Sequence, residues 1–96
     1  MSKRDLLQTK RNEIVGIAEK YGARNVRIFG SVVRGEDRPD SDIDFLMEFG
    51  PATSLMDHAG IIVELEELLG CNVDVVNDRA IKLRLREPIL REAVPL

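Results

Sequence analysis

Two aspartates stand two residues apart in the run DIDFLMEF, and a third follows in NVDVV. Successive side chains of a strand point to opposite faces, so Asp42 and Asp44 share a face if residues 42–49 are extended. If residues 72–77 form a neighbouring strand, Asp74 comes onto that face too. Such carboxylates repel one another, and a divalent cation would remove the cost; oxygen ligands suit Mg²⁺. The alternative is structural: Asp42 ends a loop, and Asp44 and Asp74 lie at solvated sheet edges.

A glycine–serine pair, Gly30-Ser31, follows the short apolar run NVRIF and precedes SVVRG, which has room for about one helical turn. A helix start presents free backbone N–H groups, glycine permits close approach, and the serine hydroxyl donates a hydrogen bond, so this junction favours a phosphate. Arg34 and Ser41 could add phosphate contacts, although a solvated Arg34 explains that residue equally well. Together with the aspartates, the pair predicts a place for a triphosphate beside a place for its metal.

The elements that must position these residues alternate along the chain as α-β-α-β-α-β-α. The pattern predicts helices over 6–21, 31–35 (one turn), 54–69 and about 80–93, the last interrupted near Pro88, with strands over 25–30, 42–49 and 72–77. Ser2 with Asp5 and Ser54 with Asp57 are candidate helix caps. We expect one α/β (α+β) domain over residues 1–96, a small mixed β-sheet with helices packed on one side.

The helix after Ser54 is expected to bury one stripe of side chains, formed by Leu55, Ala59, Ile62, Leu65 and Leu69. In the strand over 42–49 the apolar residues alternate, which places the carboxylates on the face away from the main core.

Composition excludes several classes of protein. The 96 residues are 44% hydrophobic and 32% charged, enough for one modest core, and no apolar run approaches the roughly 20 residues that span a bilayer. Cys71 is the only cysteine, so a reducing cytoplasm is the expected location. The net charge is −3, with an acidic middle, which argues against strong, direct binding of nucleic acid.

The run GSVVRGEDRPDSDID resembles the signature of the DNA polymerase β-like nucleotidyltransferase superfamily, a Gly-Ser pair followed after ten residues by Asp-x-Asp. Asp74 falls where that superfamily places its third carboxylate. The length and the ending RLREPILREAVPL are similar to the minimal nucleotidyltransferases (MNT) of bacteria and archaea. The resemblance implies the polymerase β-like nucleotidyltransferase fold.

The resemblance also implies roles for the residues of the site. Gly30 and Ser31 would bind the phosphates of ATP. Asp42, Asp44 and Asp74 would hold one or two Mg²⁺ ions, with Asp74 also helping to activate the attacking hydroxyl. Since proteins of this kind are typically the antitoxins of HEPN-domain ribonuclease toxins, the implied reaction is AMPylation: transfer of AMP from ATP to a tyrosine hydroxyl of a HEPN partner protein.

Two other functions remain open on the sequence. A binding-only antitoxin would mask its toxin by contact and retain vestigial chemistry, although all three carboxylates are present. A small-molecule nucleotidyltransferase would act on an antibiotic together with a partner subunit, and the acidic middle of the chain would suit a cationic aminoglycoside.

Overall fold

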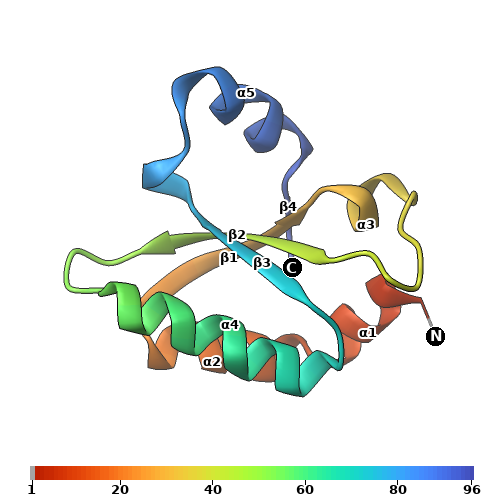
Figure 1. The fold of residues 1–96 in the computed structure, drawn as a ribbon, viewed down its shortest axis with the longest axis horizontal. Coiled ribbons are helices and arrows are strands. Elements are labelled where there is room, and N and C mark those ends of the chain that lie inside the picture. The colour runs from red at the N-terminus through yellow and green to blue at the C-terminus, as the bar shows by residue number, and fades with distance from the viewer. Residues whose placement is uncertain (1) are drawn as a thin grey trace.

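Four strands form one mixed sheet at the centre of the computed structural model, which describes residues 2–96 (Figure 1). Their order is β3-β2-β1-β4; β2 runs parallel to β3 and antiparallel to β1, and β4 is antiparallel to β1. The bounds are β1 (Ala23–Phe29), β2 (Ile43–Phe49), β3 (Val73–Asn77) and β4 (Val94–Pro95). The two-residue β4 was not predicted, because so short a segment has no periodicity.

Helices lie on both sides of this sheet, but only one side is closely packed. Their bounds are α1 (Lys3–Thr9), α2 (Arg11–Lys20), α3 (Ser31–Arg34), α4 (Leu55–Leu69) and α5 (Leu83–Glu92), with a 3-10 turn, η1 (Asp78–Ala80). α2 and α4 cover one face, whereas α5 stands on the opposite side (Figure 1) and has no buried residue. The predicted mixed α/β sheet with helices packed on one side is confirmed. Within residues 2–96 no helix combines the length and apolarity needed to cross a membrane.

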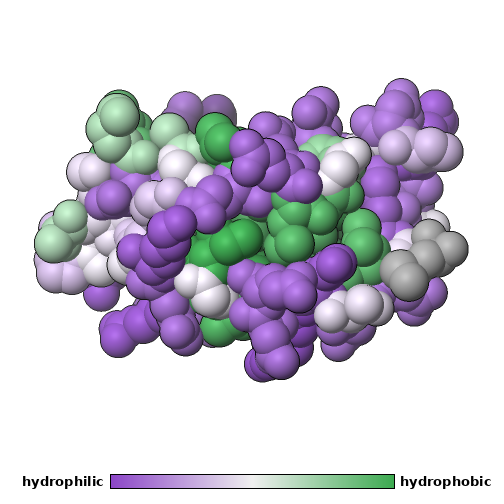
Figure 2. Space-filling view, turned by 90° about the horizontal axis from the view of Figure 1, so that it is seen from below, coloured by the Kyte–Doolittle hydropathy of each residue, from purple (hydrophilic) through white to green (hydrophobic). Residues whose placement is uncertain are grey.

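The main core fills the space between the sheet and α2 and α4. Alternate residues of β2 point into it, and Ile43, Phe45 and Met47 are fully buried there. Figure 2 looks onto this helix-covered side and shows hydrophobic atoms along the middle with hydrophilic atoms around them. Leu46 is also fully buried although it belongs to the other face of β2. The opposite face of the sheet is therefore covered at that position too.

The helix α4 begins with the predicted cap and buries part of the predicted stripe: Leu65 and Leu69 are buried and Ile62 packs against the core, but Leu55 and Ala59 do not. Ser54 and Asp57 form a reciprocal capping box. Of the α4 side chains, Ile61, Leu65 and Leu69 are buried, whereas Leu55 is 85% exposed and Ala59 is exposed. Ala59 stands two residues before Ile61, about 200° around the helix, and so faces away from the core. Leu55 is the first residue of the helix.

The N-terminal helical segment is two helices, and the prediction of one helix over 6–21 was wrong. Ser2 caps α1 by accepting from the Asp5 backbone N–H, as predicted, but α1 ends at Thr9 and α2 begins at Arg11, with Lys10 as the cap between them. No glycine or proline marks this break. Leu7 of α1 and Ile14 of α2 are both fully buried.

The predicted interruption of the last helix at Pro88 is also wrong, because α5 continues through this residue. Pro88 has no N–H to donate to the carbonyl four residues earlier, so the helix lacks one hydrogen bond there. Since α5 has no buried residue, that carbonyl has access to water.

Candidate active site

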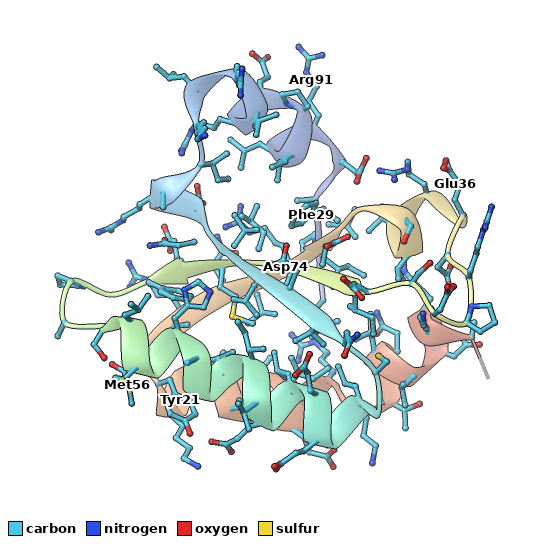
Figure 3. All side chains as sticks on the ribbon, viewed as in Figure 1. Tyr21, Phe29, Glu36, Met56, Asp74 and Arg91 are labelled. Atoms are coloured by element: carbon cyan, nitrogen blue, oxygen red, sulfur yellow. The ribbon has the colours of Figure 1, made fainter. Side chains whose placement is uncertain are left out.

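Strand pairing brings two of the three aspartates together. Asp44 of β2 is the direct register partner of Asp74 of β3, and partners in parallel strands present their side chains on the same face. Asp42 precedes β2 and is exposed, as is Asp74, whereas Asp44 is half-buried. Burial, followed by the charges of Asp74 and Asp42, raises the pKa of the Asp44 carboxyl above its ordinary value. Figure 3 shows Asp74 near the middle of the sheet.

The Gly-Ser turn is in direct contact with this carboxylate group. Gly30 has φ +81° and ψ −155°, a conformation essentially restricted to glycine. A Cβ at Gly30 would also collide with the Asp44 carboxylate. The turn after β1 and the aspartate of β2 are thus adjacent because residue 30 has no side chain. The Gly-Ser pair and the Asp-x-Asp pair, which are the two halves of the sequence motif, therefore lie together. Ser31 is half-buried and is the first residue of α3.

Of the two further residues predicted to contact phosphate, Arg34 lies at this turn, in contact with an acid that the sequence analysis missed. The Arg34 guanidinium donates to both carboxylate oxygens of Glu92, at 2.9 and 2.8 Å, and this contact raises the pKa of Arg34. The same Glu92 carboxylate accepts the backbone N–H of Gly30. Glu92 is 62 positions away from Gly30 in sequence and was not predicted to belong to the site.

The other, Ser41, belongs to the turn that leads into Asp42. Its hydroxyl accepts the Arg38 backbone N–H at 2.7 Å, and its own N–H donates to the Arg38 carbonyl. The Lys3 ammonium donates to backbone carbonyls of the same turn, including that of Ser41. The hydroxyl of Ser41 thus holds the loop that delivers Asp42 to the start of β2.

The donor set fits a hard divalent cation in its chemistry. Asp42, Asp44 and Asp74 offer only carboxylate oxygens, which Mg²⁺ prefers, and a cation would offset both the burial and the repulsion that raise the pKa of Asp44. Among residues 2–96, however, no three carboxylate, imidazole or thiol side chains converge as a complete metal-binding group. Cation binding would therefore require the exposed Asp42 and Asp74 side chains to turn toward Asp44.

Two other polar groups near the sheet have structural partners. His58 Nε2 lies 2.7 Å from the Val75 carbonyl oxygen, and its ring meets Phe49 edge to face. Asp78, the first residue of η1, accepts from Arg27 at 2.8 Å in a largely buried ion pair, while Arg86 of α5 donates to the Asp78 carbonyl. These contacts join α4 and α5 to the sheet.

The nucleotidyltransferase domain model matches residues 12–96. The chain belongs to this family. It is a nucleotidyltransferase, and the Gly-Ser turn and the carboxylates described above lie within the matched residues. The resemblance noted in the sequence is thereby confirmed at the level of the family.

Several similar proteins align with this nucleotidyltransferase over most of its length. The protein adenylyltransferase MntA of Thermococcus cleftensis is 40% identical over 78 residues, 81% of this chain and 79% of that protein. A solved structure provisionally described as a minimal nucleotidyltransferase is 46% identical, with a TM-score of 0.88, and covers 100% of this chain and 97% of its own. The MNT antitoxin complex with a tri-AMPylated HEPN toxin of Shewanella oneidensis matches at 18% identity, TM-score 0.70, over 92% and 69% of the two chains, and shares the fold.

Proposed function

We propose that this nucleotidyltransferase is an antitoxin that transfers AMP from ATP to a tyrosine hydroxyl of a HEPN-domain ribonuclease toxin. The observation that carries the proposal is the register pairing of Asp44 with Asp74 directly beside the Gly30 turn. This arrangement places acidic oxygens that could bind a cation next to a backbone N–H that could bind a phosphate.

The chemistry follows from the charges of the site. The tyrosine oxygen attacks the α-phosphorus of ATP, a P–O bond to AMP forms, the bond to pyrophosphate breaks, and the phenolic proton leaves to a base. We assign the base to Asp74, because it is exposed and next to Asp44. Gly30, Ser31 and Arg34 would bind the phosphates. Mg²⁺ held by Asp42, Asp44 and Asp74 would neutralise charge on the phosphates and favour departure of pyrophosphate.

Similarity supports the choice of acceptor. A relative at 40% identity is named a protein adenylyltransferase, and a fold neighbour is an MNT antitoxin in complex with a HEPN toxin that carries three AMP groups. Another neighbour with the same fold, at 20% identity, is a toxin–antitoxin structure with AMP-PNP. The intact carboxylates favour an enzyme over a binding-only antitoxin. Cytoplasmic location remains a prediction.

Transfer of label tests the proposal. The chain is incubated with Mg²⁺, ATP labelled at the α-phosphate, and a HEPN-domain ribonuclease, and mass spectrometry locates the label. We expect AMP on a tyrosine, loss of ribonuclease activity, and no label with Asp44→Asn. Inhibition of the ribonuclease without label would establish binding-only action and overturn the proposal. Label on an added aminoglycoside, with none on the protein, would establish a small-molecule enzyme instead.

A further inference from the structure

The Gly-Ser turn is already in contact with an anion that the chain itself supplies. Glu92 ends α5, and its carboxylate accepts from the Gly30 N–H and from the Arg34 guanidinium, which donates to both of its oxygens. The Glu92 side chain is 25% exposed. A main-chain N–H at a turn and an arginine guanidinium are the donors that bind phosphate oxygens in proteins.

A carboxylate and a phosphate compete for such donors because both are oxyanions that arginine binds strongly. We propose that Glu92 is a built-in competitor for the triphosphate: it occupies the Gly30–Arg34 donors in the free protein and must leave before ATP binds. The inference rests on the proposed function, because the competition matters only if these donors bind phosphate. It gives the C-terminal helix a regulatory role at the site.

The surroundings of Glu92 allow it to leave without unfolding the protein. α5 has no buried residue, and Leu83 and Leu85 at its start are 90% and 48% exposed. Directly after Glu92, Val94 and Pro95 pair with β1 and hold the backbone in place. Rotation of the Glu92 side chain, or a small shift of α5, releases both donors while the sheet keeps its pairing. A protein that contacts α5 would alter this equilibrium.

Competition of this kind weakens ligand binding by the fraction of molecules in which the donors are free. The contact is partly solvated, which limits its strength. We therefore expect removal of the Glu92 carboxylate to tighten ATP binding about threefold to thirtyfold. The same factor should apply to inorganic triphosphate and not to adenosine, since the contested donors face the phosphates.

Isothermal titration calorimetry on wild type, Glu92→Gln and Glu92→Ala measures these affinities. Glu36→Gln is the matched control, because Glu36 also contacts Arg34, at 3.4 Å, but is 64% exposed and does not reach the Gly30 N–H. Figure 3 shows Glu36 on the outer side of the loop after α3. We expect both Glu92 variants to gain affinity for ATP and triphosphate, and Glu36→Gln to change it by less than about twofold.

Three other outcomes would each overturn the inference. If wild type binds ATP and folded Glu92 variants bind it equally or more weakly, Glu92 positions Arg34 instead of competing, and this inference alone is overturned. An equal gain with Glu36→Gln would show a general charge effect and also overturn it. If neither wild type nor any variant binds ATP or triphosphate, the proposed function fails together with the inference.

Discussion

Replacing Gly30 with alanine tests whether the turn and Asp44 form one unit. At φ +81° and ψ −155° a non-glycine residue pays about 1–3 kcal/mol of backbone strain. The added Cβ would meet the whole Asp44 side chain, with Cγ at 3.0 Å and Cβ at 3.3 Å, so Asp44 must rotate. An off-rotamer side chain adds about 0.5–1.5 kcal/mol.

These contributions sum to a loss of about 1.5–4.5 kcal/mol in the free energy of unfolding. Small domains have about 5–15 kcal/mol in total, so Gly30→Ala should remain folded at low temperature. Rotation of Asp44 also displaces its carboxylate oxygens from their position in the site, and we expect adenylyl transfer to fall about a hundredfold or more. Urea unfolding and label transfer measure the two effects separately.

Gly70→Ala is the matched control. Gly70 is also at positive φ, +71°, but a Cβ added there would have no neighbouring atom within 4 Å, and the residue ends α4 away from the turn. It should lose about 1–2 kcal/mol from the left-handed backbone alone and keep its activity. If Gly30→Ala loses no more stability than Gly70→Ala and stays active, the close contact between turn and carboxylate plays no part in the site.

Three further predictions concern single acidic side chains. Asp42→Asn should retain the circular dichroism spectrum and melting temperature of wild type yet lose transfer activity about a hundredfold; retained activity would exclude Asp42 from the site. Asp78→Ala should lower the free energy of unfolding in urea by about 3 kcal/mol, because it leaves the largely buried Arg27 without its partner. Glu87→Ala, which breaks an exposed pair with Arg91, should lower it by under about 0.5 kcal/mol. Similar losses for the two variants would contradict this prediction. Hydrogen bonds from Tyr21 and Lys20 lower the pKa of Glu64 below 4.5. Wild type should therefore be more stable than Glu64→Gln above pH 4.5, and this difference in stability should vanish as the pH falls through the lowered pKa. A difference in thermal melts that does not depend on pH would refute this assignment.

The parts of the fold that depend on local pattern were predictable. The alternation of β2 and the Ser54–Asp57 cap are properties of neighbouring residues, and both are present. The Gly-Ser and Asp-x-Asp spacing predicted that the turn and the carboxylates would lie together, and the close approach of Gly30 to Asp44 agrees with it. The roles assigned to these residues remain predictions.

What the sequence could not supply depends on contacts between distant segments. Nothing local distinguishes Glu92 from the other acids of the chain; its contact with Gly30 exists because β4 returns the chain to β1. The break at Lys10 likewise has no local signal, because no glycine or proline stands there. The exposed Leu55 was misassigned because helical periodicity does not reveal where a helix extends beyond the surface it covers.

The two-residue β4 also affects self-association. Val94 and Pro95 pair with Ile28 and Arg27, and the Leu96 N–H donates to the Val26 carbonyl, so this segment occupies the outer edge of β1. An uncovered edge strand presents free donors and acceptors to other chains and promotes aggregation, whereas a proline on an outermost strand discourages further pairing. Residues 94–96 thus limit further strand pairing at the β1 side of the sheet.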